Sequence, residues 1–344
     1  MKAVRFYGQN DIRLEDIPIP KVEAGGLLVK VEACAICGTD LKMYLKGDPR
    51  VPTGQTIGHE FVGRITEVGS GVTGFKVGER VTMATSISCG RCGFCRLGHT
   101  NRCDHLTPIS RHYPGAFADY LAVPPAGVQG GNAVKVPSTL GDLAALAEPL
   151  SCVINAQILA GVKLGDTVVV IGCGPLGALH TQAARANGAT KILVIQRSEA
   201  RRQLAARLNV DAVINPAESD PVSQVMALTD GLGADVVIVC APDPAAQTQG
   251  LALARKGGRV NFFAGLPKGQ SEIMVDTRLI HYRELLVSGG SDSTPYHVEL
   301  AVQLLAGGRI SEHIITHRLA LDRFEEGLGL MKASQGLKIL LKPE

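Results

Sequence analysis

Four cysteines in one short segment constrain this chain more than any other feature. They follow the pattern C-x2-C-x2-C-x7-C, at Cys89, Cys92, Cys95 and Cys103. Thiols at this spacing can converge on one ion, and four thiolates make a closed tetrahedral site that suits zinc. An iron–sulfur cluster, disulfide bonds and unrelated thiols are the alternatives. Because a closed site has no free coordination position, we expect this segment to have a structural role and the chemistry to lie elsewhere.

The composition excludes several classes of protein. The chain has 344 residues, 45% of them hydrophobic, which is enough to bury two cores. Its net charge is only +3 and it has no concentrated basic run, which argues against nucleic acid or a membrane surface as the main partner. No apolar run approaches the roughly 18 residues of a membrane span. Nine cysteines, an odd number, fit a reducing compartment, so we expect a soluble, cytoplasmic protein.

A second set of metal-binding side chains is spread over the first half of the chain. Glu148 lies in the apolar stretch LAEPLSC, where a carboxylate needs a partner. Together with residues near positions 37 and 59 it makes a set of one thiol, one imidazole and two carboxylates, at Cys37, His59, Glu60 and Glu148. This set suits a catalytic zinc with one position left for water or substrate. We expect one glutamate to bind the metal and the other to lie just outside it.

A glycine-rich turn stands in the context that dinucleotide binding requires. Residues 168–171 read as a buried parallel strand, and G-x-G-x-x-G follows at the start of a helix predicted over 176–187. A second strand is predicted over 191–195. The glycines allow a tight turn and close approach of a pyrophosphate to the helix N-terminus. The predicted cofactor contacts in this turn are Gly172, Gly174, Pro175, Leu176 and Gly177.

The remaining pattern predicts an α/β protein with two domains. Apolar and polar residues alternate near the N-terminus in short runs, as in the antiparallel strands of a small barrel-like sheet. Further strands at 212–214, 235–239, 259–264 and 285–289 complete a six-stranded, doubly wound parallel sheet. We predict a catalytic domain at 1–151 containing the cysteine lobe 89–103, a nucleotide-binding domain at 152–292, and a return segment at 293–344. Cys37 is expected to precede a helix capped by Thr39 or Asp40.

At these residues the chain resembles the zinc-dependent medium-chain dehydrogenase/reductase superfamily, most closely its polyol (sorbitol-type) and threonine dehydrogenase branch. The resemblance spans essentially the whole chain. It is carried by CGTD at 37–40, the run GHEFVGRITEVGSGV at 58–72, the cysteine lobe, EPL at 148–150 and the turn at 172–177. It implies a GroES-like catalytic domain, a Rossmann domain, and assembly into a homotetramer or homodimer.

The resemblance also implies roles for single residues. Cys37, His59 and Glu148 would bind the catalytic zinc, with Glu60 as an alternate ligand or water partner, and Thr39 would carry the first proton. With the structural site this makes two zinc ions per chain. The implied reaction passes a hydride between a small-molecule secondary alcohol and a nicotinamide cofactor. The alcohol would be a polyol, a sugar or sugar derivative, or a hydroxy amino acid.

Two positions depart from the superfamily's common pattern. Lys42 stands where many relatives carry a histidine of the proton relay, and Gln196 stands where relatives that use NAD carry an acid. An amide does not repel a 2′-phosphate, and Arg197, with Arg201 or Arg202 one helical turn later, could attract one. We therefore expect a modest preference for NADP(H), with NAD(H) as the alternative.

Two rival functions and one question of substrate stay open at this point. A zinc-independent reductase of the same fold would have the second donor set by chance. A zinc ribbon that binds nucleic acid would need basic and aromatic residues around the cysteines, where only Arg91, Phe94, Arg96 and Arg102 are found. Several basic or aromatic side chains in loops are either solvated surface residues or contacts for an acidic or phosphorylated sugar: Lys42, Tyr44, Lys46, Arg50 and Arg111.

Overall fold

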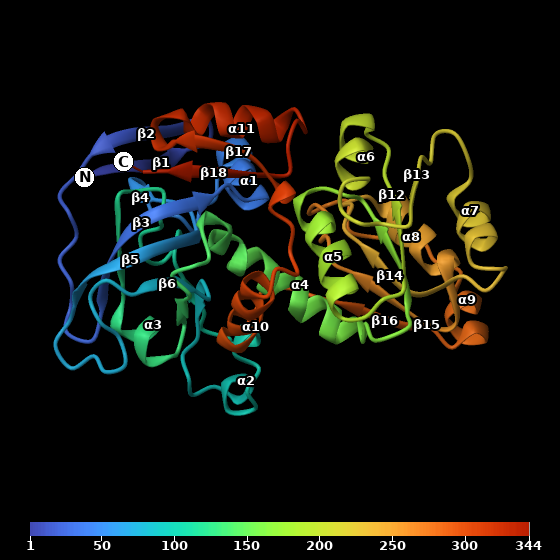
Figure 1. Cartoon of the computed structure of the whole chain (residues 1–344), viewed down its shortest axis with the longest axis horizontal. Coiled ribbons are helices and arrows are strands. Elements are labelled where there is room, and N and C mark those ends of the chain that lie inside the picture. Colours follow the sequence, from blue (N-terminus) through green and yellow to red (C-terminus); the bar gives the residue numbers. More distant parts are fainter. Residues whose placement is uncertain (344) are drawn as a thin grey trace. The chain divides into compact units, whose positions relative to one another are not determined.

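The computed structural model describes residues 1–343 and divides them into two compact units (Figure 1). Unit 1 contains Met1–Ser151, Asp292–Gly308 and the chain from Ile315 onward. Unit 2 contains Cys152–Ser291 and Arg309–Ile314. The last part of the chain therefore belongs mainly to the same unit as its beginning.

Unit 1 is built on a seven-stranded sheet around β3. Six strands follow the order β10-β6-β5-β3-β18-β17, and β9 pairs with the N-terminal half of β3. The C-terminal strand β18 pairs antiparallel with the C-terminal end of β3, so residues some 300 positions apart are neighbours. The strands are β3 (Leu27–Ala35), β5 (Glu60–Val68), β6 (Arg80–Met83), β9 (Tyr120–Val123), β10 (Ala133–Val136), β17 (Ile315–Ala320) and β18 (Lys338–Lys342).

Smaller elements complete this unit around one apolar core. A three-stranded sheet has the order β2-β1-β4, and β7 pairs with β8 beside the cysteine lobe. These strands are β1 (Lys2–Gly8), β2 (Asp11–Asp16), β4 (Gln55–Thr56), β7 (Ser86–Ile87) and β8 (Thr107–Pro108). The helices are α1 (Gly38–Lys46), α2 (Gly93–Arg96), α3 (Pro125–Gln129), α10 (Pro295–Ala306) and α11 (Phe324–Lys332). The core joins β-sheet residues such as Val29 and Phe61 to Phe324 of α11.

Unit 2 is a six-stranded parallel sheet of order β13-β12-β11-β14-β15-β16. Successive residues of its central strand pack into different cores: Val169 and Ile171 into one cluster, Val168 and Val170 into another. Such a strand is buried on both faces, which explains its continuous apolar run. The strands are β11 (Thr167–Ile171), β12 (Lys191–Ile195), β13 (Ala212–Ile214), β14 (Ala234–Val239), β15 (Ala254–Phe262) and β16 (Leu286–Gly289).

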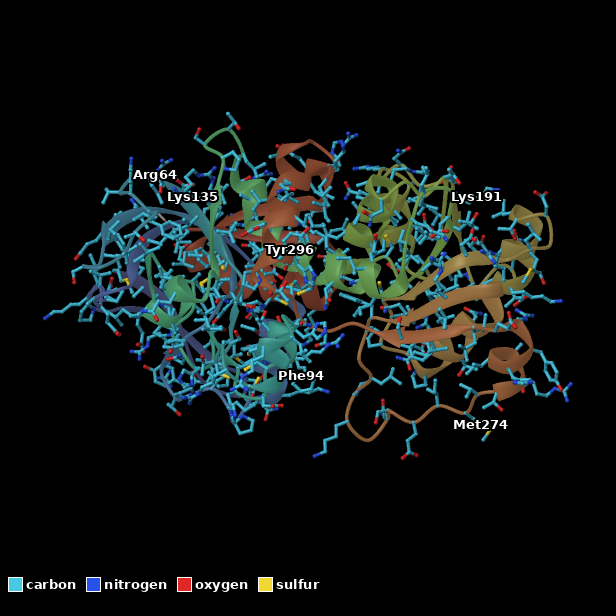
Figure 2. All side chains as sticks on the ribbon, turned by 90° about the horizontal axis from the view of Figure 1, so that it is seen from below. Arg64, Phe94, Lys135, Lys191, Met274 and Tyr296 are labelled. Atoms are coloured by element: carbon cyan, nitrogen blue, oxygen red, sulfur yellow. The ribbon has the colours of Figure 1, made fainter. Side chains whose placement is uncertain are left out.

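The helices of unit 2 cover the two faces of this sheet (Figure 1). They are α5 (Pro175–Ala186), α6 (Glu199–Ala205), α7 (Pro221–Leu228), α8 (Pro244–Leu253) and α9 (Thr277–Arg283). Helix α4 (Ala147–Ala160) contains the sequence boundary between the units. An extended loop follows β15 and carries the exposed Met274 (Figure 2). The predicted fold class, a GroES-like β-rich domain with a doubly wound parallel sheet, is confirmed.

One expectation about membrane spans is wrong. The helical stretch Asp142–Ala160, 19 residues with a mean hydropathy of 1.5, is long and apolar enough to span a membrane. Within the described residues, 83% of its most apolar window is buried inside the protein. The apolar character of this stretch is therefore accounted for by burial in the protein core, as in other core helices.

A second expectation, on the helix after Cys37, is also wrong in detail. Neither Thr39 nor Asp40 caps α1, because Cys37 itself is the N-cap residue, with extended backbone angles. Asp40 lies three residues further on, and its carboxylate accepts a hydrogen bond from the backbone N–H of Cys37 at 2.8 Å. Asp40 thus accepts the N–H of the N-cap residue from the third position of the helix, as in a capping box, and is not itself the N-cap.

His180 is a fully buried titratable group in α5. Its ring packs edge-on against Phe263, with 4.5 Å between the ring centroids, and Nδ1 lies 3.4 Å from the side-chain nitrogen of Gln157. Burial lowers the pKa of His180 to about 3. The folded state therefore holds this imidazole neutral, whereas the unfolded chain protonates it near its ordinary pKa of about 6.5.

We predict that His180 contributes to acid sensitivity. The unfolded state binds one more proton between pH 6.5 and about 3, so stability falls by about 1.4 kcal/mol per pH unit from this group as the pH drops. His180→Leu removes this term, and the difference in unfolding free energy between variant and wild type should change with that slope in urea titrations at pH 4 to 7. The exposed His112→Leu is the control. If the unfolding free energies of His180→Leu and wild type changed in parallel with pH, His180 would not be a source of the acid sensitivity.

Candidate metal and nucleotide sites

The register of two strands creates the first cluster of metal-binding groups. Ala35, the last residue of β3, pairs with Glu60, the first residue of β5. Cys37 lies two residues beyond that pair and His59 one residue before it, so both are at the same end of the sheet. Ligand atoms of Cys37, His59 and Glu60 all lie within 4.8 Å of one another. The structure thus brings together three of the four residues that the sequence predicted.

Asp40 lies beside the imidazole of this cluster. It is fully buried, and one carboxylate oxygen accepts the Cys37 N–H while the other lies 3.6 Å from Nδ1 of His59. Burial raises the pKa of Asp40. Burial also lowers the pKa of His59, but the attraction of Asp40 and Cys37 outweighs it and leaves that pKa well above its usual range. An acid on Nδ1 leaves Nε2 available as a metal ligand.

Lys338 is a member of the site that the sequence analysis missed. Leu340 of β18 pairs with Ala35 on the side of β3 opposite to Glu60's strand, which places Lys338 at the same sheet end. Its Nζ donates to Oε1 of Glu60 at 2.6 Å and also contacts Oε2. Both side chains are almost completely buried, with 2% and 1% exposure. The sequence signal was a lysine at the start of a C-terminal strand whose next three residues are apolar.

Glu148 lies outside the cluster of three. It is buried in the first turn of α4, and its Oε1 accepts a hydrogen bond from Thr85 Oγ1 at 3.3 Å. Burial raises the pKa of Glu148 to about 7, and the neighbouring charge of Glu60 acts in the same direction. Ser151, one turn further along α4, makes two contacts of its own. Its Oγ donates a hydrogen bond to the Glu148 carbonyl at 2.6 Å and lies 2.6 Å from Ser293 Oγ.

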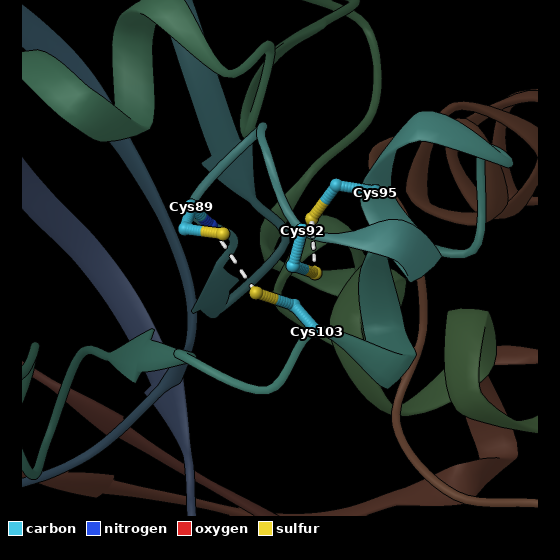
Figure 3. A group of neighbouring side chains, drawn as sticks. All are labelled: Cys89, Cys92, Cys95 and Cys103. Atoms are coloured by element: carbon cyan, nitrogen blue, oxygen red, sulfur yellow. Dashed lines mark hydrogen bonds between the residues drawn. The ribbon is translucent and has the colours of Figure 1, made fainter.

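The four lobe cysteines converge as their spacing predicted (Figure 3). Their sulfur atoms all lie within 4.8 Å of one another, on the short helix α2 and the loops around it. Backbone N–H groups point at these sulfurs: those of Cys89 and His105 both lie 3.3 Å from Sγ of Cys103. Such donors stabilise thiolates. Hydrogen bonds from Cys95 and Asp104 lower the pKa of Cys92 to about 6, so the donor set fits a cation.

The glycine-rich turn has the geometry that its sequence predicted. Gly172 has a φ of +91°, which a residue with a side chain rarely adopts. A Cβ on Gly177 would lie 2.0 Å from the carbonyl oxygen of Gly172, so only glycine lets α5 approach β11 this closely. Gly174 is the N-cap of α5, Pro175 and Leu176 open its first turn, and no acid is present there. The helix N-terminus is thus open to an anion.

The residues that follow β12 differ in the contacts that their side chains make. Gln196 is buried, and its Oε1 accepts a hydrogen bond from the Cys173 N–H at 2.8 Å, which ties it to the glycine-rich turn. Arg202 is occupied by the carbonyls of residues 196 and 197 and by Glu199. Arg197 is 79% exposed and 3.7 Å from Asp243.

Arg201 differs from its neighbours. Its Nε is buried and has no hydrogen-bond partner among residues 1–343, and burial lowers its pKa. Its Nη1 is the nearest atom to the position that a Cβ of Gly174 would occupy, at 3.6 Å. A guanidinium with an unsatisfied donor therefore lies beside the glycine-rich turn.

The other predicted residues are less informative. Thr39 is half-buried in the first turn of α1, and Lys42 and His112 are exposed. Cys152 and Cys240 are partly exposed, and Cys34 and Cys173 are buried. Burial raises the pKa of Cys173 to about 12, which makes this thiol of the nucleotide turn unreactive.

Comparison with known proteins identifies the family. Residues 23–142 match the alcohol dehydrogenase GroES-like domain, and residues 175–307 match the zinc-binding dehydrogenase family. The chain is 34% identical to the L-threonine 3-dehydrogenase of Caldanaerobacter subterraneus, over 99% of this chain and 98% of that protein. The chain belongs to the zinc-dependent medium-chain dehydrogenase superfamily. It is an oxidoreductase that acts on hydroxyl substrates with a nicotinamide cofactor.

Two solved structures support the assignment of this chain to the dehydrogenase superfamily. A dehydrogenase from Sinorhizobium meliloti, described as zinc-binding and solved with NADP bound, is 36% identical with a TM-score of 0.93, over 99% of both chains. The 2R,3R-butanediol dehydrogenase of Bacillus subtilis is 30% identical with a TM-score of 0.91, over 100% of this chain and 99% of that one.

We predict that the cysteine lobe of the dehydrogenase contributes to stability rather than to chemistry. Cys95→Ser removes one of four converging thiols, and a closed zinc site contributes folding free energy. The variant should lose one zinc ion per chain by metal analysis and unfold at a lower temperature. Cys152→Ala, at a cysteine outside both metal clusters, should retain the metal. A Cys95→Ser protein with unchanged zinc content and melting temperature would contradict the prediction.

Proposed function

We propose that this protein is a zinc-dependent, NADP(H)-preferring dehydrogenase that oxidises a secondary alcohol. The observation that carries the proposal is the cluster of Cys37, His59 and Glu60, whose ligand atoms lie within 4.8 Å of one another. Two relatives support the type of substrate. A threonine 3-dehydrogenase and a 2R,3R-butanediol dehydrogenase, by their names, both act on a secondary hydroxyl group.

We propose that Cys37, His59 and one glutamate hold the catalytic zinc and that the four lobe cysteines hold a structural one. A thiol, an imidazole and a carboxylate, each supported by a neighbouring group, fit a zinc site with an open position. When bound, zinc supplies a Lewis acid that lowers the pKa of a nearby hydroxyl group. In this geometry Glu60 is held by Lys338, and Glu148 is held by Thr85.

The surrounding residues prepare this site for proton removal. The carboxylate of Asp40 lies 3.6 Å from Nδ1 of His59, so its charge favours a proton on that nitrogen. Lys338 lets Glu60 remain charged although it is buried, since an unpaired buried carboxylate would be costly. Thr39, half-buried in the turn that Cys37 opens, is the proposed first proton carrier. Glu148, whose pKa is about 7, can hold or release a proton near neutral pH.

We propose that unit 1 is the catalytic domain and unit 2 the nucleotide-binding domain. The nucleotide-binding role of unit 2 is supported by the N-terminus of α5, which lies at the glycine-rich turn of Gly172, Gly174 and Gly177 and has no acid in its first turn. The cofactor contacts proposed from the sequence include Gln196, Arg197 and Arg201. Of the two arginines, Arg201 is the better candidate for a 2′-phosphate, because it is beside the turn and its Nε has no hydrogen-bond partner in residues 1–343.

Removal of the thiol or the imidazole tests the catalytic assignment. We predict that Cys37→Ser and His59→Ala abolish turnover and lose the catalytic zinc, while cofactor affinity stays within about three-fold of wild type. Turnover follows nicotinamide absorbance, with metal analysis and cofactor titration on the same preparations. Cys34→Ser, in β3 and outside the cluster, is the matched control. Wild-type turnover in both variants would refute the proposed metal chemistry.

The cofactor preference is tested at two positions. We predict that Arg201→Ala weakens NADP(H) binding about ten-fold or more, the loss expected for a charge-assisted hydrogen bond, with a much smaller effect on NAD(H). Gln196→Asp should shift the preference toward NAD(H) by repelling a 2′-phosphate. Arg207→Ala, exposed after the same helix, is the control. Ten-fold tighter binding of NAD(H) than NADP(H) by the wild type would overturn the preference.

We also propose that the protein is a cytoplasmic homodimer or homotetramer. Strand β16 ends the order of the parallel sheet, and its Leu286 and Val287 are 68% and 41% exposed. An exposed apolar edge strand invites pairing with a second copy. A monomeric mass by light scattering at micromolar concentration would argue against this assembly.

A further inference from the structure

The loop at residues 109–113 is fixed beside a proposed metal ligand. Ser110 is buried and has a φ of +71°, an uncommon conformation for a residue other than glycine. Its Oγ accepts a hydrogen bond from the Gly58 N–H at 3.1 Å, and Gly58 directly precedes His59. A bridge between Ile109 and Tyr113 closes the loop. Arg111 therefore starts from a backbone position that is tied to the metal cluster.

The side chain of Arg111 shares its nearest acid with another arginine. Its Nε lies 3.3 Å from Oδ2 of Asp48, but it is buried and makes no hydrogen bond within residues 1–343. Arg50 instead holds both Asp48 oxygens, at 2.7 and 2.9 Å. Hydrogen bonding to Arg50 is the main reason that the pKa of Asp48 falls to about 2. Two guanidinium groups thus face the Asp48 carboxylate, and the Nε–H of Arg111 is left without a hydrogen-bond acceptor in residues 1–343.

Arg111 is also within electrostatic range of the catalytic cluster. Asp48 follows α1, the helix that Cys37 opens. On the other side, burial raises the pKa of Asp292, and both His59 and Arg111 partly offset this rise. The Asp292 carboxylate accepts a hydrogen bond from the Ser293 N–H at 2.7 Å and is also hydrogen-bonded to the Ser86 side chain. Both acids near Arg111 are therefore engaged with other donors, and all these residues belong to unit 1.

We propose that Arg111 binds an anionic group, a carboxylate or a phosphate, carried by the alcohol substrate. The inference deepens the proposed function and rests on it. A guanidinium binds carboxylates and phosphates through parallel N–H donors, and it retains its charge at any physiological pH. The tie from Ser110 to Gly58 fixes the origin of the side chain relative to the metal ligand, so the anion and the reacting hydroxyl are held at a defined separation.

Four alcohols that differ in charge test this specificity. Three of them have six carbons: sorbitol is neutral, D-gluconate carries a carboxylate and sorbitol 6-phosphate carries a phosphate. The fourth, L-threonine, is a shorter molecule with a carboxylate and an ammonium group. We expect the wild-type kcat/KM for at least one anionic compound to exceed that for sorbitol by about ten-fold or more. The comparison of gluconate, phosphate ester and threonine then distinguishes the source of the anion. A preference for sorbitol over all three would overturn the proposal.

Variants separate recognition from structure. Arg111→Gln should lower the ratio of kcat/KM for the preferred anion to that for sorbitol by about ten-fold or more, mainly through KM, and Arg111→Lys should restore part of it. Arg13→Gln is the control, because it removes one arginine charge from the same unit at a side chain that is 56% exposed and paired with Asp11. Equal losses for neutral and anionic compounds in Arg111→Gln, or the same change of ratio in Arg13→Gln, would show that Arg111 has no specific role in anion recognition.

The two proposals can fail separately. If the enzyme turns over sorbitol or butanediol but Arg111→Gln leaves selectivity unchanged, the anion subsite is refuted and the dehydrogenase function stands. If none of these compounds is oxidised, titration calorimetry of the zinc-loaded enzyme with gluconate and with sorbitol 6-phosphate decides the subsite. Binding that Arg111→Gln weakens about ten-fold supports it, and binding that is absent or unaffected by Arg111→Gln refutes it.

Discussion

A buried carboxylate next to the thiol and imidazole of the candidate metal cluster is the constraint on which the first unit depends. Glu60 has 1% exposure, and a charge at that depth is tolerated only with a partner. Lys338 is that partner, and burial alone would lower its pKa, but the attraction of Glu60 outweighs this effect and raises it. The pairing of β18 with β3 brings this lysine to Glu60. The candidate metal cluster therefore depends on where the C-terminal strand is placed.

The same logic of paired charges organises the rest of the cluster. Asp40 closes the first turn of α1 with one oxygen and faces His59 with the other, so one acid serves the backbone and the imidazole. Glu148 is placed differently: it accepts a hydrogen bond from Thr85, and burial raises its pKa to about 7. Two buried glutamates are thus supported by different groups, Glu60 by the ammonium of Lys338 and Glu148 by the hydroxyl of Thr85.

Much of the fold could be predicted because its signals are local. Four cysteines within fifteen residues of one another converge through short loops, and Gly172 and Gly177 are required by backbone geometry. The strands of the parallel sheet were recognised because burial on both faces demands continuous apolar residues. The length of the apolar helix at 142–160 was underestimated, because polar residues such as Glu148 and Asn155 interrupt its apolar run although its mean hydropathy is 1.5.

The sequence by itself predicted the four-cysteine cluster, the glycine-rich turn and the fold class, since each depends on spacing or periodicity along the chain. Only the tertiary structure decided which groups are partners. Lys338 meets Glu60 across 278 positions. Arg201 rather than Arg197 lies near Gly174, and the Nε of Arg111 makes no hydrogen bond within residues 1–343, while Arg50 holds both oxygens of Asp48. Such pairings depend on strand register and on competition among neighbouring side chains, and these exist only when the chain is folded.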